Sequence, residues 1–304
     1  MKRVFLAVLI TTAAVILVRA GENGRRGVSI TTNDDSTSDD CSQHLQVHQS
    51  DFKSLVRGEE TRTLPNQPLT IHAEHNGGIQ LSTWDKPEFS IKLCKHVASD
   101  DDAQGRKVLD QTTLAIDGST VSVKAPENQN DYSMGTLLLV RAPRDATLDM
   151  DVHNGGISVR RFTGTAKAEA QNGGISLKQS SGKLTVHAQN GGITIQDCGG
   201  DVDARVENGG LSLKLPERWD GKGLEAHTQN GGLVVDVPRN LASGLEVSGS
   251  EHVSIICKGD ICDNGQRTWD NSHRIFHFGS GSTQIRATTV NGGIVIRDRS
   301  KDTI

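Results

Sequence analysis

The stretch that decides the fold is residues 170–196, which read AQNGGISLKQSSGKLTVHAQNGGITIQ. Asn-Gly-Gly followed by Ile returns here after 18 residues. With Ile or Leu in the fourth position, this motif occurs seven times, beginning at Asn76, Asn154, Asn172, Asn190, Asn208, Asn230 and Asn291. The three intervals after Asn154 are 18 residues each and the next is 22. Such regular spacing is typical of repeat proteins, in which each unit packs against its neighbours.

Apolar residues alternate with polar ones on both sides of each triplet. Leu184, Val186 and Ala188 precede Asn190 at every second position, and Ile193 and Ile195 follow it in the same way. A period of two is the signature of a β-strand. A further Gly lies eight residues before three of the Asn residues, so each unit holds two short strands and two turns.

One such unit cannot bury its own apolar face, but stacked units can. The sequence therefore predicts an all-β fold, a parallel β-solenoid (β-helix) with coils of about 18 residues stacked about 4.8 Å apart. The position four before Asn is mostly Ala, which indicates flattened coils with a thin core.

Four segments are expected along the chain. Residues 1–20 combine a basic start with an apolar run that is shorter than a bilayer span, which is typical of a signal peptide. Residues 21–50 are polar and favour a disordered leader. Residues 51–153 are expected to form an N-terminal β region and cap, and residues 154–298 the solenoid, with an insertion near 257–283. No later segment is apolar enough to span a membrane.

The N-terminal β region is expected to be irregular. Strands are predicted at 69–74, 78–83, 88–96, 112–117, 119–124 and 136–142, and the acidic run from Asp100 favours a short helix. Ile71 and Ala73 are out of phase by one with the later repeats, so the unit at Asn76 is expected to be a cap or a bulged coil. The unit at Asn291 is expected to close the other end.

Composition argues against several functional classes. The formal net charge is −4 and aromatic residues make up 3%, which disfavours a general nucleic-acid binder and sugar or base stacking. The catalytic motifs G-x-S-x-G and H-E-x-x-H and the P-loop are missing from the sequence. We therefore expect no enzyme, no cofactor and no nucleic-acid partner.

The five cysteines suit an exported chain, which can keep disulfides. Cys257 and Cys262 are close in sequence and are expected to form a local bridge, with zinc binding as the alternative. The pairing of Cys41, Cys94 and Cys198 is left open, and the odd number leaves one thiol unpaired or bound to a partner.

The repeats resemble a bacterial family of exported β-strand-repeat proteins of unknown function, often labelled "putative adhesins". The resemblance rests on the N-G-G-[IL]-x-[VIL] motif, on LLLVRAP at 137–143 and on QIRATTVNGGIVI at 284–296, and it covers roughly residues 60–298. It implies a parallel β-helix and a location in the envelope or at the cell surface. It supplies no catalytic residue.

The repeated asparagines are the most regular polar feature. The structural interpretation is a ladder of stacked side-chain amides at Asn154, Asn172, Asn190, Asn208, Asn230 and Asn291. The functional alternative is a rail for a metal or ligand, but calcium prefers charged oxygens and these turns lack the Asp of calcium-binding repeats. We expect no metal site.

The outward positions after each turn form a second column. Arg160, Lys178 and Lys214 would stack beside a row of hydroxyls, either as a solvated face or as a docking strip for an anionic polymer. The outward positions before each turn are mixed, including Asp149, Lys167 and Glu169, and favour a solvated face.

These observations favour a non-catalytic envelope or cell-surface protein that acts as an adhesin or scaffold. Its partner would be a cell-wall or extracellular polysaccharide, or another envelope protein. The alternatives are a polysaccharide-active β-helix enzyme and a regulatory envelope protein that binds a partner. The sequence does not distinguish the periplasm from the outer surface.

Overall fold

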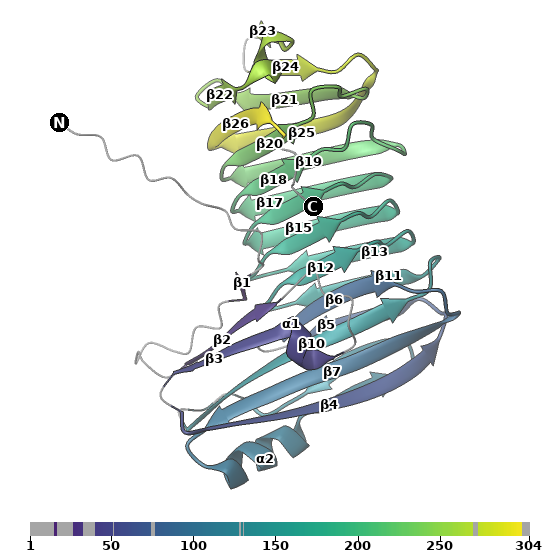
Figure 1. Ribbon diagram of the computed structural model, residues 1–304, viewed down its shortest axis with the longest axis vertical. Helices are drawn as coiled ribbons and strands as arrows, with labels where there is room; N and C mark the ends of the chain where they lie inside the picture. The colour runs from purple at the N-terminus through teal and green to yellow at the C-terminus, as the bar shows by residue number, and fades with distance from the viewer. Residues whose placement is uncertain are drawn as a thin grey trace, which may run out of the picture.

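The computed structural model describes residues 15–16, 27–32, 40–50, 52–73, 77–127, 129, 131–269 and 273–299. Most of them form two β-sheets, of 11 and 12 strands, which enclose one apolar core. The expected all-β class is confirmed. Figure 1 shows the strands stacked along the long axis of the molecule, with one helix at the lower end and a hairpin at the upper end.

The order of the strands across each sheet differs from their order in the sequence. The 11-stranded sheet contains, from one edge to the other, β22 (Ser254–Lys258), β26 (Gly293–Asp298), β20 (Leu233–Val237), β18 (Leu211–Lys214), β16 (Ile193–Gln196), β14 (Ile175–Lys178), β12 (Ile157–Arg160), β6 (Gly77–Thr83), β10 (Tyr132–Ala142), β7 (Glu88–Ser99) and β4 (Ser54–Pro65). The 12-stranded sheet contains β23 (Gln266–Trp269), β24 (His273–Phe278), β21 (Gly244–Ser250), β25 (Thr283–Asn291), β19 (Gly223–Asn230), β17 (Asp201–Asn208), β15 (Lys183–Asn190), β13 (Thr165–Ala170), β11 (Thr147–Val152), β5 (Leu69–Ala73), β9 (Thr120–Lys124) and β8 (Thr113–Asp117). A small sheet contains β1 (Val15–Ile16), β2 (Gly27–Thr32) and β3 (Leu45–Ser50); the helices are α1 (Cys41–His44), α2 (Asp102–Gln111) and the 3₁₀ helix η1 (Asp260–Asp263).

Each regular repeat contributes one strand to each sheet. In the 12-stranded sheet, Leu184 pairs in parallel with Ala166 and Val202, the residues 18 positions before and after it. In the 11-stranded sheet, Ile193 pairs with Ile175 and Leu211 by the same interval. All of these side chains are at most 3% exposed, so the columns expected from the sequence pattern form the core.

The sheets are mixed, which corrects the expectation of parallel pairing throughout. At one end, β7 pairs antiparallel with β4 and β10, and β8 pairs antiparallel with β9. At the other end, β24 pairs antiparallel with β21 and β23. These segments lack the regular repeat that carries the chain to the facing sheet. Two of the pairs, β8 with β9 and β23 with β24, are consecutive in the sequence, and strands joined directly as a hairpin must be antiparallel.

The unit that begins at Asn291 does not close the end of the stack as expected. Strand β25 lies between β19 and β21, and β26 lies between β20 and β22 (Figure 1). The last repeat in the sequence is therefore interior, while β21 to β24, which come earlier in the chain, form the end.

The phase shift in the first unit is absorbed by its turn. Ala73 pairs with Val152 in one sheet and Ile79 pairs with Ile157 in the other. Six positions separate Ala73 from Ile79, whereas five separate Val152 from Ile157. The first turn is thus one residue longer, and the apolar residues on both sides stay in their columns. Asn76 itself lies outside the described residues.

The expected signal peptide, residues 1–20, lies outside the described part of the chain except for β1. Residues 21–50 differ from the expected disordered leader, because they contain β2, α1 and β3. Cys41 forms a disulfide with Cys94 on the outer face of the 11-stranded sheet and packs with Leu137 and Leu139. This covalent link fixes the start of α1 to the sheet.

The short helix expected after Asp100 is α2. Asp101 caps it by accepting a hydrogen bond from the Ala103 backbone N–H at 3.3 Å. At its other end, Lys95 Nζ donates to the carbonyl oxygens of Leu109 at 2.9 Å and Thr112 at 2.6 Å. A cation at a helix C-terminus also complements the helix dipole.

Candidate functional site

The regular asparagines form one hydrogen-bonded ladder along the turns between the sheets. Each Nδ2 donates to the Oδ1 of the preceding rung at 3.0–3.2 Å, from Asn172 to Asn154, Asn190 to Asn172, Asn208 to Asn190, Asn230 to Asn208 and Asn291 to Asn230. Because the amides bond one another, the arrangement supports the structural interpretation. Within the described residues, no group of three or more His, Cys, Asp or Glu side chains is placed to hold a metal ion.

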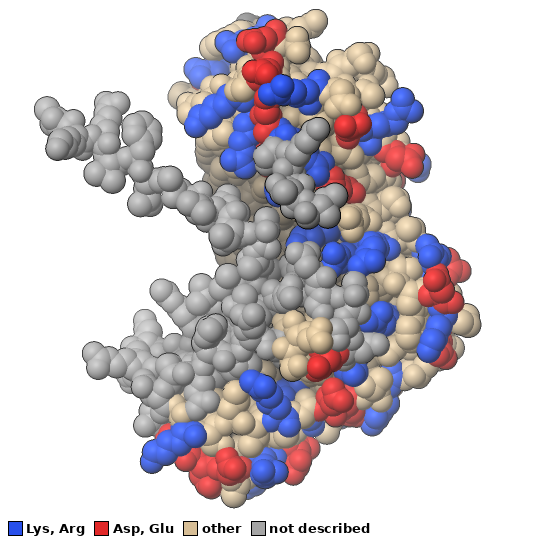
Figure 2. Space-filling model, viewed as in Figure 1, with Lys and Arg blue, Asp and Glu red and all other residues tan. Residues whose placement is uncertain are grey.

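The structure places the basic column on β12, β14 and β18 of the 11-stranded sheet. Arg160 pairs in register with Lys178, and Lys214 lies two strands further along the same column, beyond Gln196. However, Lys178 is only 8% exposed. On the parts of this view that Figure 2 draws in colour, both Lys and Arg side chains and Asp and Glu side chains lie at the surface.

A hollowed surface lies on the 12-stranded sheet. Two adjoining hollows, of about 320 and 510 Å³, share Thr70, Asp149 and Lys167 in their walls. Together they extend over the outer face of β5, β11, β13 and β15, and we call this surface the furrow. The first hollow is rich in hydroxyls, and the second is rich in charged side chains.

Charged side chains in the furrow pair with one another, both along a strand and across neighbouring strands. Lys167 Nζ lies 2.9 Å from the Glu169 carboxylate and 4.0 Å from that of Asp149. The hydrogen bond to Glu169, followed by the charge of Asp149, raises the pKa of Lys167. His72 contacts Asp151 through Nδ1. These contacts join the lining side chains to one another in one polar array.

The other end of the furrow repeats this arrangement. His187 Nε2 lies 3.1 Å from the Glu207 carboxylate, with each side chain close to half exposed. At the hydroxyl-rich end, Thr147 pairs in register with Thr165, which pairs with Lys183 on the next strand. Donors and acceptors therefore recur from strand to strand along the furrow.

Sequence reasoning placed several of these residues in an outward column but did not identify the site. The alternation of Asp149, Lys167 and Glu169 with buried residues was visible in the sequence. The contribution of Thr70 and His72 was not, because their unit is separated from the repeats by 78 residues and is out of phase. Nor does a column of outward residues show whether the surface is concave.

Four of the five cysteines are paired. The Cys257 and Cys262 sulfur atoms lie 2.05 Å apart, and those of Cys41 and Cys94 lie 1.98 Å apart. Cys198 is unpaired and buried in the core. Burial raises the pKa of its thiol to about 11, so the reactive thiolate is scarce at neutral pH.

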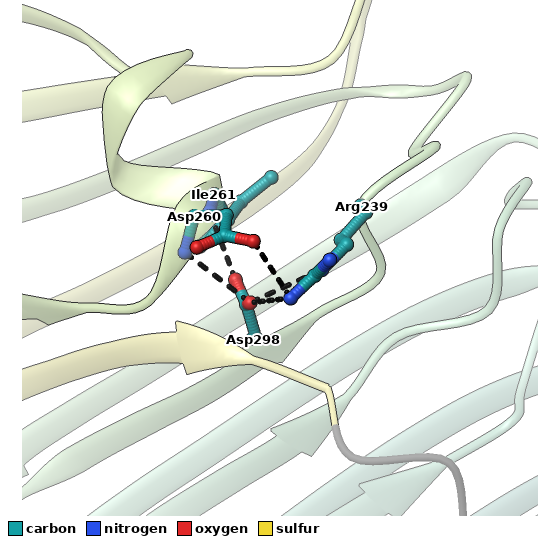
Figure 3. A network of polar contacts seen from close by, with 4 residues as sticks. All are labelled: Arg239, Asp260, Ile261 and Asp298. Carbon is teal, nitrogen blue, oxygen red and sulfur yellow. Dashed lines mark hydrogen bonds and ion pairs between the residues drawn. The ribbon is translucent and has the colours of Figure 1, made fainter.

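A polar network ties the Cys257–Cys262 loop to β26 (Figure 3). The Asp298 carboxylate accepts hydrogen bonds from the backbone N–H groups of Ile261 at 2.8 Å and Asp260 at 3.2 Å. Arg239 Nη2 lies 3.0 Å from Asp298 and 2.8 Å from Asp260. These contacts, the hydrogen bond from Ile261 foremost, lower the pKa of Asp298. Because the network joins protein segments to one another, we assign it a structural role.

No protein-family model and no curated protein matches this sequence. Solved structures give weak matches. A "putative cell adhesion protein" from Clostridium sporogenes is 8% identical with a TM-score of 0.31, and the match covers 80% of this chain and 100% of that one. A "putative adhesin" from Parabacteroides merdae is 8% identical with a TM-score of 0.41, over 81% and 96% of the two chains. A "Putative lipid binding protein" from Parabacteroides distasonis is 8% identical with a TM-score of 0.25, over 79% and 96%.

With TM-scores below 0.5, the function has to be argued from the residues of this chain. None of the helices in its described part is both long and apolar enough to cross a membrane.

Proposed function

We propose that this chain is a non-catalytic protein of the cell envelope or cell surface, built as a rigid β-solenoid, which binds an extended polar polymer in the furrow. The two disulfides support an oxidising compartment outside the cytoplasm. The apolar start of the sequence, which is typical of a signal peptide, supports export.

The lining of the furrow is the observation that carries the proposal. Its charged side chains are Asp149, Asp151, Glu169 and Glu207 against Lys167 and Lys183. Four carboxylates against two ammonium groups disfavour a polyanion, because like charges repel. The same lining offers hydroxyls, carboxylate acceptors and ammonium donors at the spacing of adjacent strands. We therefore infer a neutral polysaccharide as the ligand.

The state of the carboxylates supports binding rather than catalysis. The side chains of Asp149, Glu169 and Glu207 are 51%, 46% and 47% exposed, and each has a cationic or histidine partner. A glycoside hydrolase needs one carboxylic acid that stays protonated near neutral pH, and burial is the usual way to achieve this. Half-exposed, paired carboxylates do not provide that environment.

The proposal is tested by binding to neutral and acidic polysaccharides at low and high salt. We expect binding to a neutral polymer, and we expect Lys167→Ala to weaken it by about tenfold, because a charge-assisted hydrogen bond contributes about 1.5–3 kcal/mol. Arg205→Ala is the matched control. It removes another exposed cation, which bonds Asp203 on the same sheet face, but it lies outside the furrow.

Other outcomes would redirect the proposal. Binding that is equally strong in the Lys167 and Arg205 variants would rule out the furrow. Salt-sensitive binding to acidic polymers that is lost in Lys178→Glu plus Lys214→Glu would instead assign the ligand to the basic column. Absence of binding to every polymer would leave a scaffold or a protein partner.

A further inference from the structure

Asn264 and Gly265 form an Asn-Gly step that lies outside the asparagine ladder. Asn264 is the C-cap residue of η1, and its backbone N–H donates to the carbonyl oxygen of Ile261. Its side chain is exposed. Among the residues that the structure describes, neither the Asn264 side chain nor the Gly265 N–H has a hydrogen-bond partner. The residue that follows is glycine, so no side chain shields the backbone nitrogen.

The Asn-Gly steps of the ladder are restrained at the same atoms. Asn190 Nδ2 donates to Asn172 Oδ1, and Asn190 Oδ1 accepts from Asn208 Nδ2, each at 3.2 Å. The next backbone nitrogen is also engaged, because the Gly191 N–H donates to the Asn208 carbonyl oxygen at 3.0 Å. The N–H of Gly209 is engaged in the same way, one repeat further along. Both the amide and the nitrogen that follows it are therefore held in the ladder and free at Asn264.

These two groups can react with each other. Once the Gly265 nitrogen has lost its proton to hydroxide, it attacks Asn264 Cγ and closes a five-membered imide, while Nδ2 takes a proton from water and leaves as ammonia. Water then opens the imide at one of its two carbonyl carbons. Breaking the N–Cγ bond gives aspartate, and breaking the bond to the backbone carbonyl carbon gives isoaspartate, in which the chain continues through the side chain. One ammonia leaves and one oxygen enters from water, with no oxidation.

We propose that Asn264 is a site of spontaneous modification, converted to aspartate and isoaspartate in the folded chain while the asparagines of the ladder are retained. The difference comes from the fold, because the reacting groups are the same at every Asn-Gly step. In the ladder, the side chain has to leave two amide partners before Cγ can turn toward the backbone nitrogen. At Asn264 the exposed side chain rotates without that loss.

The isoaspartate form would lengthen the backbone between η1 and β23 by one atom. The η1 side is fixed by the Cys257–Cys262 disulfide and by the two backbone N–H groups that bond Asp298. A Cβ atom on Gly265 would lie 2.6 Å from the Phe278 ring, so the backbone there packs directly on a buried side chain. The extra atom has to be accommodated in β23, and we expect the pairing of β23 with β24 to loosen.

The test is peptide mapping by mass spectrometry of the purified full chain after incubation at mildly alkaline pH. We expect Asn264 to lose its amide at least about 25-fold faster than Asn190, about fivefold for each of the two amide hydrogen bonds that must break first. In urea the two rates should converge, because the restraint of the fold is gone. Equal rates in the folded chain, or an acceleration of Asn264 in urea as large as that of Asn190, would overturn the proposal.

Two variants connect the modification to the strand. Asn264→Gln removes the site, because glutamine has to close a larger and slower ring. Asn240→Gln is the matched control, since it changes another exposed asparagine, which is followed by leucine rather than glycine. After the same incubation, amide hydrogen exchange over residues 266–269 should be faster than in fresh protein for the wild type and the control, and unchanged for Asn264→Gln. Isoaspartate in the wild type without faster exchange would refute the loosening of β23.

Discussion

Replacing Gly231 with Ala should separate two stacked turns, whereas replacing its neighbour Gly232 should not. A Cβ atom on Gly231 would lie 1.8 Å from the carbonyl oxygen of Gly209 and 2.5 Å from its carbonyl carbon. A Cβ atom on Gly232 would lie 3.6 Å from the carbonyl oxygen of Gly293, which is ordinary contact. Both substitutions replace a glycine by alanine at adjacent positions of one turn. They therefore differ mainly in the space that the folded chain leaves for the added Cβ atom.

The expected magnitude follows from the bonds that hold the turns together. Non-bonded heavy atoms settle near 3.5 Å, so the turns must move apart by about 1.7 Å. This movement would break the bonds from Asn230 Nδ2 to Asn208 Oδ1 at 3.1 Å and from the Gly209 N–H to the Asn230 carbonyl at 3.0 Å. At about 1 kcal/mol for each bond, with added strain, Gly231→Ala should lower the free energy of unfolding by about 2–4 kcal/mol.

Gly232→Ala should change the same free energy by less than about 1 kcal/mol, because Ala restricts the unfolded chain without a clash in the folded one. The assay is urea unfolding of both variants, with the slope of the transition checked for constancy. If the free energies of unfolding of the two variants differed by less than about 1 kcal/mol, the turns would not be as closely stacked as described.

Three further predictions concern buried or stacked polar groups. Burial and the charge of Arg57 lower the pKa of His96 from 6.5 to about 4, and both ring nitrogens lack a partner among the described residues. The unfolded chain therefore binds the extra proton more readily, so the stability that is present above pH 6.5 is lost as the pH falls toward 4. Between pH 7 and pH 4.5 this loss is about 2 kcal/mol, and His96→Leu should remove it from denaturation curves at these two pH values. The Cys198 thiol, with its pKa raised to about 11, should be alkylated at pH 8 about 100-fold more slowly in the folded protein than in urea, and equal rates would mean that the thiol is exposed. Asn190→Ala removes two hydrogen bonds of the ladder and should lower the free energy of unfolding by about 1–2 kcal/mol. In the wild-type chain, deamidation at Asn172 and Asn190, measured by mass spectrometry, should be slower than in an unstructured Asn-Gly peptide.

The central part of the fold was predictable because its signals agree with one another. The 18-residue interval, the alternation of residues such as Leu184 and Val186, and the repeated turn glycines all require the same stacked strands. The antiparallel ends were not predictable in this detail. Strands such as β7 and β10 carry no repeat motif, and alternation alone does not specify the neighbour with which a strand pairs.

The site was less predictable than the fold. Sequence columns identified which residues point outward, but not how far each side chain is covered, and Lys178 is only 8% exposed. The pairing of Cys41 with Cys94 also depends on contacts between residues 53 positions apart, which no local pattern encodes.

The interior position of β25 and β26 has a consequence for how the chain acquires its structure. A linear stack of repeats can grow from one unit to the next as the polypeptide emerges, because each new unit docks on the one before. Here β21 and β22 emerge before the strands on which they dock, so they must wait, or dock wrongly on β19 and β20, until residues 283–298 arrive. This long-range dependence should slow folding and leave strand edges open to aggregation in the meantime. A chain released or cut before Thr283 would therefore lose an inner layer of the stack rather than its tip, which makes the completeness of the polypeptide a condition for closing this end.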